Sequence, residues 1–283
     1  NSMTNEYEIL QLEWDYCIVQ DQSRNKKKLT RGVDYDKTWV NLGEGFAKRG
    51  NQITFFNQRK FSKLYNTINF ETFELIQAYK TSTIYFKDKN HVYIDSYMNR
   101  DFKILDDADP KSFKILDIEK GYSTSANIDY WYGVKIPFRL ADAVIFEGGI
   151  YQKVGNQVFF SFVNKLDCDA DTFEIVDKRE HHKTVFKDKN HIYHKGKILE
   201  GANPKTFHFI ENCINDELRP YYYNCDIHYY AKDDQYAYFV DSVNSIKIIK
   251  TKDVDGFDFK VVDSRGIAFD KNYEYHRGVK KRI

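Results

Sequence analysis

Short runs in which hydrophobic and polar residues alternate recur along most of the chain. In "HVYID", Val92 and Ile94 fall on one side of an extended strand, while His91, Tyr93 and Asp95 fall on the other. This two-residue period predicts a β-strand with one face toward a core. The polar tripeptides "DKN", "GNQ" and "DDQ" precede such runs, and Asp and Asn favour tight turns because their side chains accept bonds from nearby backbone. The pattern therefore predicts strands joined by short turns.

One octapeptide occurs twice, as "FKDKNHVY" from Phe86 and as "FKDKNHIY" from Phe186. Each copy is followed by a second phrase, "ADPKSFKIL" or "ANPKTFHFI", in which proline presets φ at the first central position of a turn. Looser copies of one or both phrases begin at Gly50, Gly155, Asp233 and Phe269. Self-similarity of this kind predicts an array of one supersecondary unit. We expect Asp88 and Asp188 to lie at equivalent corners of that scaffold.

The second strand of each unit begins at a recurring phenylalanine. These anchors are Phe73, Phe113, Phe173, Phe207 and Phe257. Their intervals vary, whereas a β-solenoid holds its period tightly. We therefore predict an all-β fold of repeated antiparallel β-meander units, in a propeller-like or stacked array, with a β-solenoid as the alternative.

The two octapeptides and the small-residue hairpin "HKGKILEGA" (His194–Ala202) resemble the bacterial DKNYW repeat family. The resemblance covers most of residues 40–278 and implies a repeated β scaffold, with no catalytic residues to carry over. It divides the chain into an N-terminal segment with the first strands, 1–40, and a repeat array, 41–283. A spacer at 117–153 departs from the regular pattern.

The composition agrees with this fold class, and the charge limits the classes of partner that the protein is expected to bind. Aromatic residues make up 17% of the chain, with 22 Tyr and 22 Phe, and such rings pack well in sheets. The formal net charge of +1 gives no overall field to attract nucleic acid or an anionic membrane. No apolar run approaches the ~20 residues that span a bilayer. We expect a soluble, cytoplasmic protein, or a periplasmic or envelope-associated one if a signal peptide has been removed.

The stretch "DCDAD" has acidic residues at the one-three-five spacing of a calcium loop: Asp167, Asp169 and Asp171. An EF-hand also needs Gly at its sixth position and Glu at its twelfth, where this chain has Thr172 and Lys178. Because the stretch aligns with the proline-containing turns of the other copies, we interpret it as a repeat turn.

Other candidate chemistry is weak. His191 and His194 point to opposite faces of a strand, and the four cysteines form no CxxC pair, so neither pattern predicts a metal site. The "KDKN" turns lack a neighbouring nucleophile and base, and no GxSxG, HExxH or P-loop occurs. We predict that the chain is not an enzyme and carries no cofactor; a site assembled from distant residues is the alternative.

Two aromatic clusters, "NIDYWYG" and "RPYYYNCDIHYY", interrupt the repeat. Tyr, Trp and Arg are enriched at interface hot spots, and insertions on repeat arrays tend to line the binding face. The candidate partner-binding residues are Tyr130, Trp131, Tyr132, Arg219, Tyr221, Tyr222, Tyr223, Tyr229 and Tyr230. The alternative is that these rings fill the core.

These features favour a non-catalytic protein that binds another protein. By analogy, a bacterial immunity or antitoxin-type protein that caps a toxin fits such a scaffold. The alternative is a carbohydrate-binding or envelope-associated module that uses Trp131 and the run from Tyr221 to Tyr223 as stacking platforms.

Overall fold

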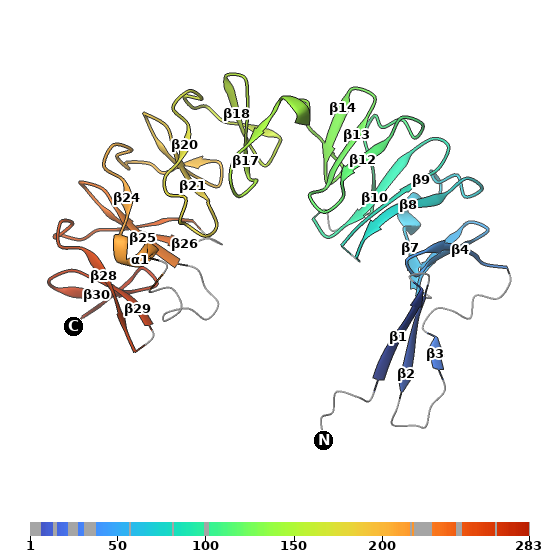
Figure 1. Ribbon diagram of the computed structural model, residues 1–283, viewed down its shortest axis with the longest axis horizontal. Helices are drawn as coiled ribbons and strands as arrows, with labels where there is room; N and C mark the ends of the chain where they lie inside the picture. Colours follow the sequence, from blue (N-terminus) through green and yellow to red (C-terminus); the bar gives the residue numbers. More distant parts are fainter. Residues whose placement is uncertain are drawn as a thin grey trace. The chain divides into compact units, whose positions relative to one another are not determined.

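In the computed structural model, short β-strands pair into separate antiparallel sheets (Figure 1). The structure describes residues 38–282 apart from 57, 81, 99–101, 216, 218–227, 242–244 and 264, with 228 and 282 as backbone only. Strand residues 7–13, 16–21 and 28–30 are also described as backbone. The chain divides into two compact units, Asn1–Arg139 and Leu140–Ile283, and the boundary falls inside the spacer at 117–153.

The first unit has a three-stranded sheet followed by three four-stranded sheets. The three-stranded sheet contains β1 (Tyr7–Glu13), β2 (Tyr16–Asp21) and β3 (Lys28–Thr30). Sheet I contains β4 (Val40–Gly43), β5 (Phe46–Arg49), β6 (Gln52–Phe55) and β7 (Gln58–Lys60), and the 3-10 helix η3 (Ser62–Leu64) follows it. Sheet II contains β8 (Glu74–Tyr79), β9 (Thr83–Lys87), β10 (Val92–Ser96) and β11 (Lys103–Ile104). Sheet III contains β12 (Lys114–Asp117), β13 (Tyr122–Ser125), β14 (Ile128–Trp131) and β15 (Val134–Lys135).

The second unit begins with the 3-10 helix η4 (Leu140–Asp142) and has four four-stranded sheets. Sheet IV contains β16 (Val144–Ile145), β17 (Tyr151–Val154), β18 (Gln157–Phe160) and β19 (Asn164–Lys165). Sheet V contains β20 (Glu174–Ile175), β21 (Val185–Lys187), β22 (Ile192–His194) and β23 (Lys197–Ile198). Sheet VI contains β24 (His208–Phe209), β25 (His228–Lys232), β26 (Ala237–Asp241) and β27 (Lys247–Ile249), with the helix α1 (Glu211–Ile214) after β24. Sheet VII contains β28 (Asp258–Val262), β29 (Arg265–Phe269), β30 (Tyr273–His276) and β31 (Val279–Arg282).

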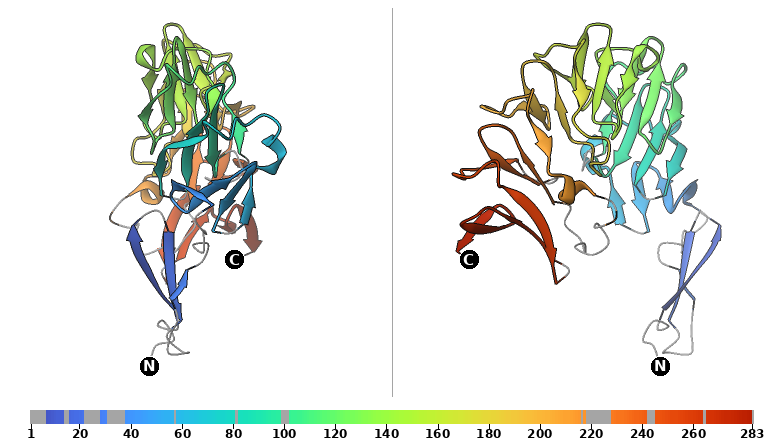
Figure 2. Two further views of the ribbon diagram at one scale, coloured as in Figure 1. Left: turned by 90° about the vertical axis from the view of Figure 1, so that its right-hand side faces the viewer. Right: turned by 60° about the vertical axis from the view of Figure 1, so that its left-hand side comes forward.

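The strand order in each four-stranded sheet follows the chain, and every pairing is antiparallel. Within each unit the sheets succeed one another in chain order (Figures 1 and 2). This confirms the predicted all-β fold of repeated meander units, the topology also found in propeller blades. The spacer at 117–153 proves regular in structure, because it supplies strands to sheets III and IV.

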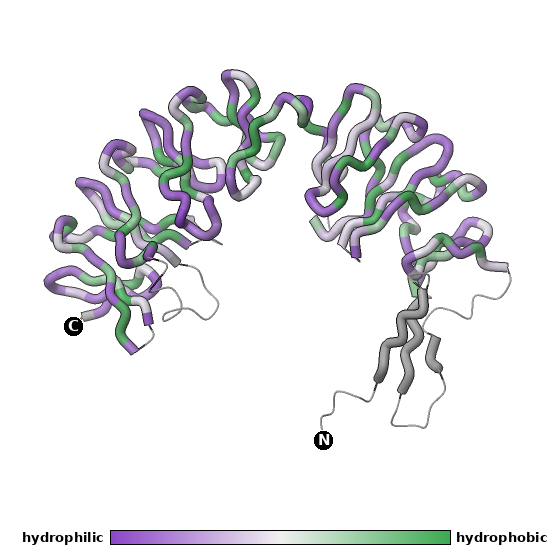
Figure 3. The backbone as a smooth tube through the Cα atoms, viewed as in Figure 1, coloured by the Kyte–Doolittle hydropathy of each residue, from purple (hydrophilic) through white to green (hydrophobic). Residues whose placement is uncertain are grey.

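The prediction that each strand has only one buried face is wrong for the central hairpins. In sheet II, Val92 and Ile94 pack against sheet III in a cluster with Tyr130, whereas Tyr93 and Phe86 pack against sheet I. All five are essentially inaccessible to solvent. Hydrophobic residues therefore follow the strands and hydrophilic ones the turns (Figure 3). Burying each such side chain contributes about 1.5–3 kcal/mol, so neighbouring sheets stabilise one another.

The recurring phenylalanines are confirmed as anchors. Phe73, Phe173, Phe207 and Phe257 are 0–6% exposed, and Phe113 is half-buried against the cluster between sheets II and III. Each buried anchor contacts the tyrosine of the third strand of its own sheet, with ring centroids 5.1–5.6 Å apart. The first and third strands of a sheet are thereby held together across the second.

The turn between the third and fourth strands requires glycine for two reasons: the positive φ of its backbone and the close packing around it. Lys195 and Gly196 have φ of 51° and 72°, which is the geometry of a type I′ turn. A Cβ at Gly196 would lie 2.6 Å from the ring of Phe160 in the preceding sheet. Ile94 and Phe239 approach Gly133 and Gly278 in the same way, at 2.7 and 2.8 Å. In each case, a side chain of one sheet packs against the turn glycine of the sheet that follows it in the chain.

The outer face of sheet VII is polar where the inner sheets are apolar. Glu274 and His276 follow Asp270 by four and six residues, as Val92 and Ile94 follow Asp88 in sheet II, so they occupy the same strand positions. Lys260 lies 2.9 Å from Glu274 and also covers the ring of Phe269. This face therefore lacks the apolar pattern through which sheets II and III pack on one another.

Gly196→Ala should destabilise the protein more than Gly155→Ala does. Both glycines have positive φ, which costs an alanine about 1–2 kcal/mol. Only Gly196 has a ring in contact distance, since nothing lies within 4 Å of a Cβ at Gly155. We expect an additional loss of about 1–3 kcal/mol for Gly196→Ala, measured by urea denaturation. Equal losses would contradict the seating of Phe160 on this turn.

The double change Glu274→Val and His276→Ile should make the protein self-associate. It restores the apolar pattern of an inner sheet on a face with no further sheet in the described chain. Sedimentation velocity should show concentration-dependent dimers. The matched control, Glu200→Val with His208→Ile, makes the same chemical change at exposed positions and should remain at the wild-type size. Association of both variants would show that surface hydrophobicity alone is responsible.

Candidate functional site

The most conspicuous polar residue of the repeat is a buried aspartate at the turn of the central hairpin. In sheet II, Asp88 Oδ1 accepts hydrogen bonds from the backbone N–H groups of Asn90 and His91, both at 2.7 Å. Its Oδ2 accepts the hydroxyl of Tyr93 and the backbone N–H of Asn69, also at 2.7 Å. The carboxylate thus joins a turn, a core ring and the loop that leads into the sheet.

The same pairing of aspartate and tyrosine recurs in sheets V, VI and VII, but in sheet VII the hydroxyl of Thr251 replaces the backbone N–H of the incoming loop, at 2.7 Å from Asp270 Oδ2. The tyrosine hydroxyl lies 2.8, 2.6 and 2.7 Å from Oδ2 of Asp188, Asp233 and Asp270, respectively. The four tyrosines, always five residues after the aspartate, are Tyr93, Tyr193, Tyr238 and Tyr275. The expectation that Asp88 and Asp188 occupy equivalent corners is confirmed. In sheet III, Ser125 takes this place by bonding the backbone N–H of Asp109 at 2.8 Å.

Two opposing effects act on the corner carboxylates. Burial raises the pKa of Asp88 and of Asp188, but the hydrogen bonds outweigh it, so both pKa values lie below the ordinary aspartate value. The pKa of Tyr93 is raised by burial first and by the bond to Asp88 second. The corners of Asp88 and Asp188 therefore each hold an ionised carboxylate beside a neutral phenol, which is a structural pairing.

The loop before the first strand is tied to this corner as well. Asp169 donates its backbone N–H to Asp188 Oδ2 at 2.7 Å, and its side chain caps Thr172. Thr172 Oγ1 in turn accepts the N–H of Lys189 in the hairpin turn at 3.0 Å. The "DCDAD" stretch is thus the predicted repeat turn, and Asp171 within it is exposed. In the described residues, no three His, Cys, Asp or Glu side chains gather as metal ligands do.

In several sheets, a lysine on the second strand donates hydrogen bonds to carbonyl groups of the loop that leads into the next sheet. Lys48 Nζ lies 2.7 Å from the carbonyl oxygens of Phe70 and Phe73. Lys232 makes the same contacts with Asp255 and Phe257 at 2.9 and 3.0 Å, and Lys153 reaches Ala170 at 2.7 Å. At the same register, Lys87 and Lys187 pair instead with Glu74 and Glu174 at 3.4 Å. These ammonium groups are engaged in the scaffold.

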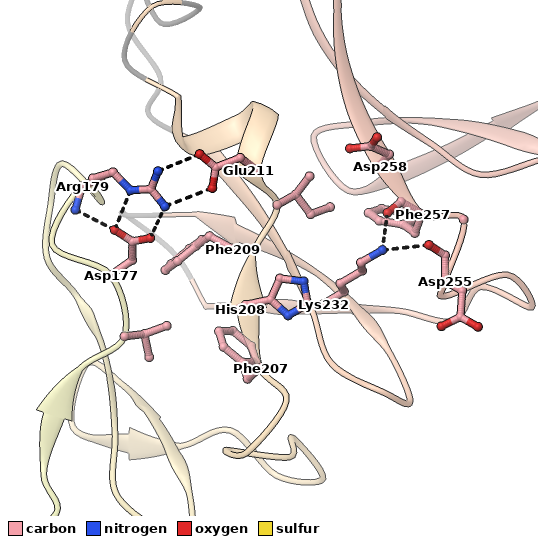
Figure 4. A pocket seen from close by; sticks show the side chains of 13 residues that line it. Asp177, Arg179, Phe207, His208, Phe209, Glu211, Lys232, Asp255, Phe257 and Asp258 are labelled. Carbon is pink, nitrogen blue, oxygen red and sulfur yellow. Dashed lines mark hydrogen bonds and ion pairs between the residues drawn. The ribbon is translucent and has the colours of Figure 1, made fainter.

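The second unit has a groove of about 490 Å³ beside β24 (Figure 4). Arg179 spans its wall, with Nη1 2.8 Å from Glu211 and Nη2 2.9 Å from Asp177. This pairing lowers the pKa of Glu211 and raises that of Arg179. Lys232, on the far wall, holds the loop carbonyls. Arg179 thus links the loop of sheet V to α1 in sheet VI, and Lys232 links sheet VI to the loop that leads into sheet VII.

Three of the candidate partner-binding residues lie in the core. Tyr130, Tyr229 and Tyr230 are 0–2% exposed, and the hydroxyl of Tyr130 donates to Asp106 O at 2.7 Å. The interface interpretation is corrected for these three, because alternate residues of a strand with two buried faces have no side open to a partner. Four further candidates, Arg219 and Tyr221 to Tyr223, lie outside the described residues.

Trp131 and Tyr132 are brought together and remain partly accessible. Their rings lie 5.6 Å apart at the end of β14, and Tyr132 donates its hydroxyl to Glu119 O at 2.8 Å. Tyr97 and Met98, which the sequence analysis missed, are 63% and 44% exposed, and Tyr97 lies 6.2 Å from Tyr132. A comparison of "DSYMNRDFKI" with its counterpart "HKGKI" would have marked them as an insertion in the first copy.

The fold and these turns define a β-meander repeat protein. The sequence profile of the DKNYY family matches residues 46–224 and again 151–282. The chain belongs to the DKNYY family. The two matches start at equivalent points, since Phe46 and Tyr151 each begin the second strand of a sheet, in the first and second unit.

No curated protein and no solved structure matches the chain significantly. None of the helices among the described residues is long and apolar enough to cross a membrane.

Asp188→Asn should destabilise the protein by about 2–4 kcal/mol at neutral pH, because an amide cannot accept all four hydrogen bonds and a bond to a charged group contributes about 1.5–3 kcal/mol. The folded pKa of Asp188 is lowered, so its stabilisation is present above the unfolded pKa of about 4 and is lost as pH falls through the folded value. Urea titrations should therefore show the deficit shrinking at acid pH. Asp171→Asn, at an exposed turn position, should change stability by less than about 0.5 kcal/mol. A deficit that grows on acidification would contradict this account.

Proposed function

We propose that this DKNYY-family chain is a non-catalytic protein-binding scaffold of the immunity type, which occupies a toxin partner and neutralises it. One observation carries the proposal: the recurring polar side chains are used within the scaffold, whereas Tyr97, an aromatic residue that is 63% exposed, lies in a segment between β10 and β11 that is longer than its counterpart in sheet V. Asp88 and Asp188 use both carboxylate oxygens in the corners, and Lys48 and Lys232 hold backbone carbonyls.

A rigid array supports binding more readily than chemistry. Stacked sheets with both faces packed hold surface residues in fixed positions, which lowers the entropy lost on association. The charge balance, with a formal net charge of +1, favours a partner recognised by shape and local contacts over one recognised by bulk charge.

The test uses purified products of the genes adjacent to this one. The expected result is a stoichiometric complex with one of them by size exclusion and calorimetry, together with rescue of growth when both are expressed. Products of unrelated genes serve as controls. Flat titrations against all neighbours, with no specific protein enriched from the native host, would refute the proposal. Binding on a glycan array would favour the carbohydrate-binding alternative.

A further inference from the structure

One strand position carries a lysine in every four-stranded sheet that is followed by another sheet of the same unit. It is the residue of the second strand that pairs with the first residue of the first strand. The lysines there are Lys48, Lys87, Lys153, Lys187 and Lys232, in sheets I, II, IV, V and VI. Sheets III and VII, the last sheets described in the two units, have Thr124 and Phe269 at this position. The lysine therefore accompanies the junction between one sheet and the next.

The lysines have two kinds of partner. Lys48, Lys153 and Lys232 donate hydrogen bonds to backbone carbonyls of the loop that leads into the next sheet. Lys87 and Lys187 pair instead with the glutamate opposite them on the first strand of their own sheet. The opposite strand residue accounts for the difference, because no carboxylate faces the three lysines that reach forward. The residues opposite these three are Val40, Val144 and His208.

The loops differ in charge according to whether they receive a lysine. Each loop that receives one has an acidic residue two positions before its anchoring phenylalanine and another directly after it, whereas the other loops have basic residues or histidine there. The acidic loops are 71–74 ("ETFE"), 171–174 ("DTFE") and 255–258 ("DGFD"), and the basic loops are 111–114 ("KSFK") and 205–208 ("KTFH"). Acidic and basic loops therefore alternate from sheet II to sheet III, and from sheet V through sheet VI to sheet VII.

The charge of a loop is linked to the behaviour of the lysine that follows it in the chain. The last residue of each loop is the first residue of the first strand, so the acidic loops of sheets II and V supply Glu74 and Glu174. These glutamates hold Lys87 and Lys187, and the next loop is basic. Sheet VI has a basic loop, so its Lys232 is available to the acidic loop of sheet VII.

The junction between sheets VI and VII shows the geometry of a lysine that reaches forward (Figure 4). Lys232 Nζ lies 2.9 Å from Asp255 O. The carboxylates of Asp255 and Asp258 belong to the same loop, and both residues line the groove together with Lys232. The ammonium group thus lies in a loop that carries two negative charges.

Two other junctions show that these acidic side chains act on the lysine. Lys153 Nζ lies 3.7 Å from Asp171 Oδ1 in the acidic loop of sheet V. Burial lowers the pKa of Lys48, and the negative charge of Glu74 in the acidic loop of sheet II acts in the opposite direction. An acidic loop therefore attracts the ammonium group that its carbonyls hold, whereas a basic loop in the same place would repel it.

We infer that the alternating charge of these loops determines which sheet can pack after which: a sheet whose lysine reaches forward requires a following sheet with an acidic loop. The repeats share their corners and anchors, so apolar packing alone gives little discrimination between a correct and an incorrect neighbour. Like-charge repulsion against the wrong loop supplies that discrimination. Repeats of similar sequence are thereby kept from packing out of order. The inference concerns assembly of the array and does not depend on the proposed partner.

The test is a double-mutant cycle on the full-length chain with Asp255→Lys and Lys232→Met. Asp255 is exposed and bonds Lys232 through its backbone oxygen, so Asp255→Lys reverses the charge of the loop and leaves this acceptor in place. Hydrogen-exchange mass spectrometry should show protection factors in residues 250–262 falling about five-fold when Lys232 is present, and less than about two-fold when it is replaced by methionine. The five-fold loss should shrink at about 1 M salt, because screening weakens the repulsion.

The matched control makes the reverse exchange at the equivalent position of a basic loop. Lys205→Asp changes the loop of sheet VI, where the lysine of the preceding sheet, Lys187, is already paired with Glu174. Protection factors in residues 201–210 should therefore change by less than about two-fold.

A further variant, His208→Glu, gives sheet VI the strand residue that sheets II and V have. The carboxylate should pair with Lys232 and draw it from the loop, so that Asp255→Lys then lowers protection by less than about two-fold. This background keeps the test decisive if Lys232→Met disturbs the loop by itself. Two outcomes would overturn the inference: equal losses of protection from Asp255→Lys in all three backgrounds, or a five-fold loss that salt does not reduce.

Discussion

The buried carboxylate at the hairpin corner is the contact on which the other features of the repeat depend. Asp88 satisfies three backbone N–H groups that the turn and the incoming loop would otherwise leave without partners inside the protein. It also accepts the hydroxyl of Tyr93, which allows a large phenolic ring to lie between two sheets. Without this acceptor, the buried hydroxyl would cost about 1–3 kcal/mol as an unmade hydrogen bond. A turn, a core ring and a connection between sheets are thus fixed by one side chain.

This contact explains why the sheets stack. A tyrosine with a satisfied hydroxyl behaves as a hydrophobic residue, so both faces of a central hairpin can be buried. Each sheet then presents one apolar face forward and one backward, and the forward face fits the glycine turn of its neighbour. Sheet VII differs on one face, where Glu274 and His276 take the strand positions that are apolar in sheet II.

The turns could be predicted because they depend on residues close together in the sequence. The burial of individual side chains could not, because it depends on contacts between strands and between sheets. Pro110 and the corner aspartates act within a few residues, and Ser112 bonds back to Asp109 O across the predicted proline turn. The alternation at Val92, Tyr93 and Ile94 predicts a strand with one buried face, because tyrosine and aspartate count as polar residues in such a pattern. Tyr93 is buried as well, because its hydroxyl donates a hydrogen bond to Asp88, and this bond forms only in the folded hairpin. Adjacent residues of an aromatic cluster also differ in burial, since Tyr130 is buried and Trp131 is partly exposed.

The duplicated organisation bears on where function can reside. Residues that both copies keep are accounted for by turns, anchors and loop contacts, as Asp88 and Asp188 illustrate. A residue that only one copy carries has no such explanation, and at Tyr97 it is also exposed. The family's recurring motif therefore reports how the chain folds, because its aspartates and tyrosines are used in turns and in contacts within the sheets.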